Sequence, residues 1–432
     1  MNEQFVVNEH GHLTIGGVDT TYLAAKYGTP LFVYDVNKLR SNARAFINGF
    51  KSLGVKAQVA YASKAFSSIA MLQVAKQEGL SLDVVSQGEL YTALAADFPV
   101  EKIHMHGNNK SQAELEMAVE HHIGCIVIDN FYEIELLEQI LAKHDTEMDV
   151  LIRVTPGIEA HTHDYIMTGH EDSKFGFDLA NGQAEKAFQL LQDKKQFRVK
   201  GLHCHIGSQI FETEGFLMAI RRLFETLAAW KDRYGYAPEV LNLGGGFGIR
   251  YTEEDQPLAL EHYVEEIVKE IGKQTEHHQM IFPEIWIEPG RAIVGNTAIT
   301  LYRVGSKKEI PQVRNYIAID GGMTDNIRPA LYQAKYEATI ANKANQPERF
   351  KTSVAGKCCE SGDMLLWDIM LPEVDSGDIL AVFSTGAYGY SMSSHYNRLP
   401  KAAIVFVENG EDKLVMQRES YKDLVRYDLS YE

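Results

Sequence analysis

Short apolar runs alternate with longer segments of helical period from about residue 57 to residue 290. The longer segments carry helix signals. "LEHYVEEIVKEIGK" repeats apolar residues every three to four positions, and "SQAELEMAVEHHI" opens with Ser111 and Glu114 in capping-box spacing. The short runs predict eight strands: "QVAY" (58–61), "LDVV" (82–85), "IHMH" (103–106), "CIVID" (125–129), "VLIRV" (150–154), "VKGLHCH" (199–205), "VLNL" (240–243) and "IWIE" (285–288). Eight strands that alternate with helices predict a parallel (β/α)8 barrel of the TIM type.

An open, doubly wound sheet is the alternative arrangement for alternating strands and helices. Such a sheet normally carries its phosphate-binding glycine turn after the first strand. In this chain the rich glycine cluster, "LNLGGGFG", follows the seventh predicted strand instead. The position of the glycines therefore favours the barrel.

The pattern changes after residue 290, where β-rich runs are broken by Gly-Asp, Asn-Gly and Gly-Ala turns. These runs predict a second, mostly antiparallel β domain. The N-terminal stretch "FVVNEHGHLTIGG" predicts a hairpin that joins this domain rather than the barrel. We therefore expect an N-terminal segment at 1–34 that pairs with the β domain, a barrel at 35–290 and the β domain at 291–432.

The chain has a formal net charge of −17, from 42 basic and 59 acidic residues. This balance argues against nucleic acid or an anionic membrane surface as the main partner, although a small anionic ligand responds to local charge instead. The N-terminus lacks a secretory signal pattern, and no apolar run is long enough to cross a bilayer. None of the four cysteines forms a metal-type C-x-x-C pair. We expect a cytoplasmic protein with reduced thiols and no metal site.

Polar residues collect at the ends of the eight predicted strands, which is where barrel enzymes place their active sites. They are Lys64, Ser86, His106, Asn108, Arg153, His203, His205, Gly244 to Gly246 and Glu288. Each alone has an ordinary explanation, such as a lysine that reaches solvent, a core histidine, a tight glycine turn or a structural salt bridge. Their collection at one end of the barrel favours a functional site.

The chemistry of these positions converges on one cofactor. Gly244 to Gly246 leave backbone N–H groups unobstructed for a phosphate, and Ser208 offers a further donor. Glu288 can face a heterocyclic nitrogen, and Arg291 can bind a carboxylate through two hydrogen bonds. Lys64 can form a Schiff base when burial and neighbouring charge favour its neutral amine. Together with a histidine that stacks on a planar ring, these groups suit pyridoxal 5'-phosphate, with Glu288 keeping the pyridine nitrogen protonated.

Seven motifs follow in the order that one enzyme family shows: "YASKAF", "HCHIGSQI", "LGGGFG", "IEPGR", "DGGMTDNIRPALY", "CCESGD" and "GAY". The chain resembles the diaminopimelate decarboxylase family of alanine-racemase-like (fold type III) pyridoxal phosphate enzymes. The motifs extend from residue 61 to residue 388, so the resemblance covers nearly the whole chain. It implies decarboxylation of meso-2,6-diaminoheptanedioate to L-lysine and CO2, the last step of lysine biosynthesis.

The resemblance also implies a role for each matching residue. Lys64 would be the Schiff-base lysine, His205 would stack on the cofactor ring, and Cys359 would donate a proton. The remaining cofactor contacts would come from Ser208, Gly245, Gly246, Glu288, Gly290, Arg291 and Tyr388. The substrate contacts would come from Arg291, Arg328, Tyr332, Glu360 and Tyr388. The enzyme would be a homodimer in which Cys359 and Glu360 reach the active site of the partner subunit.

Two departures from the family pattern leave these roles in place. Phe66 stands where the lysine motif often has asparagine, and Thr324 and Asn326 stand where other residues are common. None of the three coincides with a residue to which the resemblance assigns a role.

Other functions compete with this interpretation. Decarboxylases of ornithine, arginine or carboxynorspermidine share most of the machinery and differ mainly at Arg328, Tyr332 and Glu360. An alanine racemase would benefit from a weaker electron sink, and the acid in "EPGR" argues against it. A non-enzymatic pyridoxal phosphate carrier would be expected to lack the lysine or the cysteine. A metal-dependent hydrolase could use His203 and His205, which share one face of a strand, but no further ligand is spaced nearby.

Overall fold

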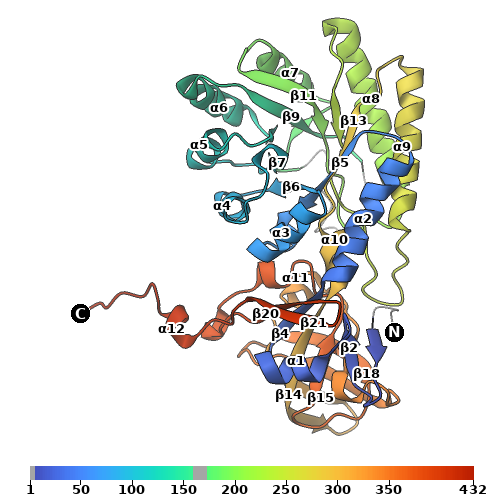
Figure 1. Cartoon of the computed structure of the whole chain (residues 1–432), viewed down its shortest axis with the longest axis vertical. Helices are drawn as coiled ribbons and strands as arrows, with labels where there is room; N and C mark the ends of the chain where they lie inside the picture. The colour runs from blue at the N-terminus through green and yellow to red at the C-terminus, as the bar shows by residue number, and fades with distance from the viewer. Residues whose placement is uncertain (1–4, 159–172) are drawn as a thin grey trace. The chain divides into compact units, whose positions relative to one another are not determined.

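The computed structural model describes residues 5–158 and 173–432 and divides the chain into two compact units (Figure 1). One unit comprises 42–249 and 256–292, and the other comprises 1–41, 250–255 and 293–432. Residues 35–41 and 250–255 thus group with the second unit, although the apolar pattern places them in the barrel. Residues 35–41 do so because strand β4 (Leu31–Asp35) leads directly into helix α2 (Val36–Ser52), and β4 pairs with strands of the second unit.

The first unit is a closed parallel barrel, as the alternating pattern predicts. Its strands are β5 (Ala57–Ala62), β6 (Ser81–Val84), β7 (Ile103–Met105), β8 (Cys125–Ile128), β9 (Met148–Thr155), β11 (Phe197–His203), β12 (Val240–Asn242) and β13 (Glu284–Ile287). Each pairs in parallel with its neighbours in the sheet, and the β13–β5 and β8–β9 pairings close the circle. The short strand β10 (Phe177–Asp178) adds to β9 outside this circle. The barrel is confirmed, and the open sheet is excluded.

Helices follow the barrel strands (Figure 1). They are α3 (Ile69–Gln77), α4 (Gln87–Ala95), α5 (Gln112–Glu120), α6 (Phe131–His144), α7 (Gln183–Gln192), α8 (Glu214–Tyr234), α9 (Leu260–His277) and the short α10 (Arg291–Val294). Helix α5 begins with the predicted capping box between Ser111 and Glu114. Ser86 caps helix α4 in a similar way, because its hydroxyl accepts a hydrogen bond from the Glu89 N–H. Ser86 therefore serves as a helix cap.

The interior of the barrel holds an imidazole that is kept neutral. His104, on β7, is buried and stacks on Trp286 of β13 with 4.2 Å between ring centroids and 6° between ring planes. Burial, assisted by the charge of His106, lowers the pKa of His104 to about 3. The unfolded chain, in contrast, protonates this side chain near pH 6.5. The stability that the neutral imidazole contributes is therefore complete above about pH 6.5 and is lost as the pH falls toward 3.

Replacing His104 with phenylalanine should make the barrel less sensitive to acid. Between pH 7.5 and pH 5.0 the unsubstituted protein (the parent) loses about 2 kcal/mol of unfolding free energy because unfolding lets His104 take up a proton. The variant has no imidazole at this position, so its unfolding free energy should fall by about 2 kcal/mol less over the same pH range. Urea unfolding of the apoprotein at the two pH values measures the difference. His121→Gln, at an exposed histidine, is the control and should titrate like the parent. Equal losses in the parent and in His104→Phe would contradict the assignment.

The second unit is built on a mostly antiparallel sheet. Its strands are β4, β14 (Ala298–Ile310), β15 (Arg314–Ile319), β16 (Ala338–Ile340), β17 (Phe350–Ala355), β18 (Met364–Leu371), β19 (Ile379–Val382), β20 (Ala403–Glu408) and β21 (Glu411–Met416). The order is β18-β17-β15-β14-β4-β20-β21, and β19 joins β14 to β16. Among the described strands of this unit, only two pairs, β15–β17 and β20–β4, are parallel. The helices of this unit are α1 (Thr20–Tyr27), α11 (Arg328–Tyr332) and α12 (Tyr421–Leu424).

The N-terminal segment contributes to this unit in two ways. Strands β1 (Phe5–Val7), β2 (Leu13–Ile15) and β3 (Val18–Asp19) form a small sheet of their own. Their buried side chains share one hydrophobic core with residues such as Ile299 and Val405 of the larger sheet. From residue 5 to residue 35, only β4 pairs directly with that sheet, between β14 and β20. No helix in the described part of the chain is long and apolar enough to cross a membrane.

Candidate active site

The barrel unit brings several of the predicted residues together at the carboxyl ends of its strands. Lys64 is exposed and lies in a 3-10 turn (Ser63–Ala65) directly after β5. Glu288 and Gly290 follow β13, the neighbour of β5 in the barrel. A Cβ atom at Gly290 would lie 3.0 Å from the Ala62 Cβ, so glycine allows these two strand ends to approach closely. The register of β5 and β13 therefore places the lysine and the acid at adjoining strand ends.

Glu288 is buried, and its carboxylate contacts three side chains from three other strands. Asn242 Nδ2, on β12, donates to Oε1 at 2.7 Å, and His106 Nε2, just beyond β7, lies 3.0 Å from the same oxygen. His203 Nε2, on β11, lies 3.1 Å from Oε2. A carboxylate offers about four acceptor positions, so these contacts leave room for one further N–H donor.

The charge state of Glu288 follows from these contacts. Burial alone would raise the pKa of Glu288, but the charge of His106, together with the close contacts that both histidines make with the carboxylate, holds it well below its usual range. Burial lowers the pKa of His203 to about 4, so this histidine is neutral near pH 7. At the end of the barrel the structure therefore holds an ionised carboxylate in a buried place, where one would normally be neutral.

His205 lies beyond the end of β11 and belongs to a different set of contacts. Its Nδ1 accepts the backbone N–H of Gly245 at 3.1 Å. Burial, with the charges of Lys64 and Arg153, keeps the pKa of His205 well below its ordinary value. His205 is therefore a neutral, flat ring held by the glycine loop. The alternative in which His203 and His205 bind a metal ion together is not favoured, because His203 contacts Glu288 and His205 contacts Gly245.

The glycine loop after β12 packs too closely for any side chain. A Cβ atom at Gly245 would lie 2.3 Å from the carbonyl oxygen of Glu288, and one at Gly246 would lie 2.4 Å from that of Gly207. Gly244 has φ +67° and donates its N–H to Asn242 Oδ1 at 2.9 Å. The backbone of this loop thus contacts His205, Asn242 and Glu288.

Arg291 and Ser208 meet beside this loop. The Arg291 Nη2 donates to the Ser208 Oγ at 3.0 Å, and Arg291 is buried. A guanidinium next to a hydroxyl and a glycine loop suits an oxygen-rich dianion such as a phosphate.

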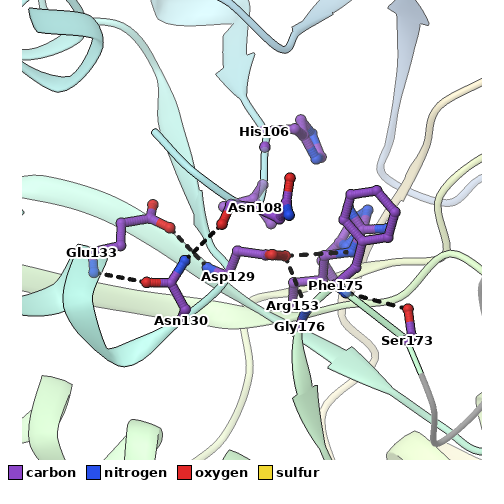
Figure 2. A network of polar contacts seen from close by, with 12 residues as sticks. His106, Asn108, Asp129, Asn130, Glu133, Arg153, Ser173, Phe175 and Gly176 are labelled. Atoms are coloured by element: carbon purple, nitrogen blue, oxygen red, sulfur yellow. Dashed lines mark hydrogen bonds and ion pairs between the residues drawn. The ribbon is translucent and has the colours of Figure 1, made fainter. Parts of the chain in front are cut away.

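A polar network holds the ends of β7, β8 and β9 in place (Figure 2). Asp129, after β8, lies 3.9 Å from Arg153 Nε and accepts the Gly176 N–H at 2.9 Å. The Arg153 guanidinium also lies 4.2 Å from the ring centroid of Phe175. Arg153 lies within β9 rather than at its end. The network fixes the buried Arg153 guanidinium, whose charge acts on His106 and His203.

Asn108 and Glu133 complete this network. The backbone carbonyl of Asn108 accepts from the Asn130 side chain at 3.0 Å, and Asn130 accepts the Glu133 N–H at the start of α6. Lys110, fully buried, donates to Glu133 and to the carbonyls of Gly107 and Val127. The backbone of Asn108 thus helps to hold the loop after β7.

The predicted residues of the second unit lie around α11 and the loops of its sheet. Arg328 is buried, donates to the Tyr336 hydroxyl and lies 4.9 Å from the ring centroid of Tyr251. Tyr332 ends α11 and is half-buried. Tyr388 has φ +58°, a strained value for a tyrosine. Cys359 and Glu360 are exposed in the loop between β17 and β18.

Two buried contributors to the site were not identified from the sequence. Asn242 holds Glu288, and Asp83, on β6, lies 3.7 Å from His106. Burial raises the pKa of Asp83, which is opposed by the charge of His106. Both residues interrupt apolar runs, "VLNL" and "LDVV". A polar residue inside a buried strand is the signal that could have revealed them.

These features fit a cofactor with a phosphate group and a protonated ring nitrogen. Arg291, Ser208 and the glycine loop suit the phosphate. Glu288 is an ionised acceptor for a ring N–H, and His205 presents a neutral ring. Lys64 offers its amine at the neighbouring strand end.

Comparisons with known proteins agree with this chemistry. The family model for the pyridoxal-dependent decarboxylase, pyridoxal binding domain, matches residues 36–295. A diaminopimelate decarboxylase of Bacillus methanolicus is 65% identical over 96% of this chain and 96% of its own. One from Bacillus subtilis is 62% identical over 98% and 97%. A diaminopimelate decarboxylase from M. jannaschii, crystallised with L-lysine, is 33% identical with a TM-score of 0.93 and covers 99% of this chain and 98% of its own.

Proposed function

The chain belongs to the pyridoxal-dependent decarboxylase family, and we propose that it decarboxylates meso-2,6-diaminoheptanedioate (meso-diaminopimelate) to L-lysine and CO2. The observation that carries this function is the match, over almost the full length of both chains, to enzymes named for this reaction. The L-lysine bound to the M. jannaschii relative is the expected product. The reaction is the last step of lysine biosynthesis, and we place it in the cytoplasm.

Pyridoxal 5'-phosphate supplies an electron sink that stabilises the charge left when CO2 departs. Lys64 would tether this cofactor through its Nζ atom, and His205 would lie against the ring. Arg291, Ser208, Gly245 and Gly246 would bind the phosphate. This assignment follows the hydrogen bond between Arg291 and Ser208, which favours the phosphate over a substrate carboxylate as the partner of Arg291.

Glu288 would accept a hydrogen bond from the ring nitrogen and keep that nitrogen protonated. Its pKa, which lies well below the usual range, supports this role because only an ionised carboxylate favours a cationic donor. Gly290 supports the same end of the site by allowing the close approach of β5 and β13.

The substrate carries two carboxylates and two amines, and the second unit offers matching groups. Arg328 and Tyr332 would bind a carboxylate, Glu360 would bind the distal amine, and Tyr388 would contact cofactor and substrate. Cys359 would donate a proton to the carbon that lost CO2. The family resemblance supports these roles, with Cys359 and Glu360 acting across the interface of a homodimer.

A substrate comparison tests the function. The purified enzyme, supplied with pyridoxal 5'-phosphate, should release CO2 from meso-diaminopimelate, with kcat/KM at least about 100-fold above that for ornithine, arginine or carboxynorspermidine. A substrate without the second carboxylate leaves the buried Arg328 without a carboxylate partner, which weakens its binding in the transition state. CO2 release coupled to product analysis measures the ratio. A higher kcat/KM for any of the three competitors would transfer the function to that decarboxylase.

A further inference from the structure

The contacts of Glu288 reach beyond the cofactor to a second layer of charged groups. His106 Nε2 lies 3.0 Å from Glu288 Oε1 and 3.7 Å from Asp83 Oδ1, so one imidazole stands between two carboxylates. His203 faces only one carboxylate, that of Glu288. All four side chains are at least nine-tenths buried. The two histidines on Glu288 therefore have unequal surroundings.

The unequal surroundings give the two histidines different charges. Burial lowers the pKa of both, but the charges of Asp83 and Glu288 outweigh burial at His106 and raise its pKa. At His203 burial prevails. A neutral His203 that faces an ionised carboxylate carries its proton on Nε2, and its Nδ1 has no hydrogen-bond partner in the described part of the chain. His106 is thus the cation of the cluster, and His203 is a neutral donor.

Other ionisable groups face this cluster from several elements. Arg153 on β9 and Lys64 after β5 add positive charge, and His104 on β7 and His205 after β11 are kept neutral by their own surroundings. Arg153 is already engaged by Asp129, at 3.9 Å. His106 is therefore the cation in direct contact with Glu288.

We propose that His106, braced by Asp83, is a positioning residue that keeps Glu288 ionised before the cofactor binds, while His203 orients the same carboxylate without supplying charge. The proposal rests on the proposed function, since it assigns Glu288 to the cofactor ring. Without a cation beside it, a buried glutamate takes up a proton, and this proton must be removed before a cationic ring nitrogen can bind. With a charged His106 beside it, Glu288 stays ionised in the apoenzyme, so no proton has to be removed from it when the cofactor binds.

The charge of His106 has a measurable signature in the pH dependence of cofactor affinity. In His106→Gln the pKa of Glu288 rises, because burial is no longer opposed by a neighbouring cation. Pyridoxal 5'-phosphate should then bind roughly 10- to 30-fold more weakly than to the parent near pH 6.5, and the deficit should shrink to less than about twofold by about pH 9. The ratio of variant to parent Kd cancels the ionisation of the cofactor itself.

His203→Gln is the matched control, because it changes the other imidazole on the same carboxylate. Its affinity should fall by a factor that is constant with pH, since His203 carries no charge to lose. Quenching of intrinsic fluorescence in the apoenzyme on adding pyridoxal 5'-phosphate gives each Kd, and thermal unfolding checks that each variant is folded.

A measurement on the unsubstituted apoenzyme tests the proposal even if a variant does not fold. Nitrogen-15 NMR of histidine-labelled parent apoenzyme should show His106 as an imidazolium and His203 as a neutral ring at pH 7.5. A neutral His106, or a His106→Gln ratio that does not change with pH, would overturn the proposal. If the parent binds no pyridoxal 5'-phosphate at all, the proposed function fails instead, so the two failures are distinguishable.

Discussion

Replacing Lys64 with alanine should lower kcat by at least about 10³-fold and remove the visible absorption band of the lysine-linked cofactor. Lys64 is exposed in the turn after β5 and is not part of the barrel core, so the variant should fold with an unchanged thermal midpoint. The lost rate reflects the loss of the tether and of the amine that exchanges with substrate. Absorption spectra and CO2 release from meso-diaminopimelate measure both effects.

Lys56→Ala is the matched control for this prediction. Lys56 is exposed and directly precedes β5, whereas Lys64 follows the same strand at its opposite end. The control should keep the band and the parent rate. Borohydride reduction followed by peptide mass spectrometry should place the cofactor on the peptide that contains Lys64. A cofactor found on another lysine would refute the assignment.

Replacing Cys359 with alanine should lower kcat by roughly 10²- to 10⁴-fold, the usual range for a lost proton donor, and change KM by less than about threefold. Cys359 is exposed, and its backbone N–H, which the substitution retains, donates to Asn397 at 2.7 Å. Folding should therefore be preserved. Steady-state kinetics separate kcat from KM, and a fall in both kcat and thermal midpoint would indicate a structural role instead.

The neighbouring Cys358 supplies the control. It is buried, and burial raises the pKa of its thiol to about 11. Cys358→Ala should keep kcat within about threefold of the parent, even if stability decreases. Equal losses in both cysteine variants would argue that the whole loop, rather than the Cys359 thiol, is required.

Mixed dimers test whether Cys359 acts across a subunit interface. When Lys64→Ala and Cys359→Ala chains are denatured together and refolded in equal amounts, half of the proposed homodimers should be mixed. In each mixed dimer one of two sites combines an intact lysine with an intact cysteine, so activity should recover to about a quarter of the parent. No recovery would mean that both residues act within one chain.

The sequence by itself determined the barrel and the polar residues that lie at the carboxyl ends of its strands. The barrel strands are mostly apolar because both of their faces are largely buried, and such runs are visible without a structure. The first polar residue after a run marks where the strand leaves the core, which is why Lys64, Glu288 and the glycine loop were found. The same rule also points to Ser86, which caps helix α4, and to Asn108, whose backbone carbonyl accepts from Asn130, because helix caps and loop contacts also occupy strand ends.

The tertiary structure decided which of these residues act together. His203 and His205 are two positions apart in the sequence, but one contacts Glu288 and the other contacts Gly245. Asp83 and Asn242 are hidden inside apolar runs, and their roles follow from the strand register that places them beside His106 and Glu288. The charge of each group depends on burial and on neighbours from distant parts of the chain. Only the closed barrel brings those neighbours together, and so only the structure shows that Glu288 is held ionised.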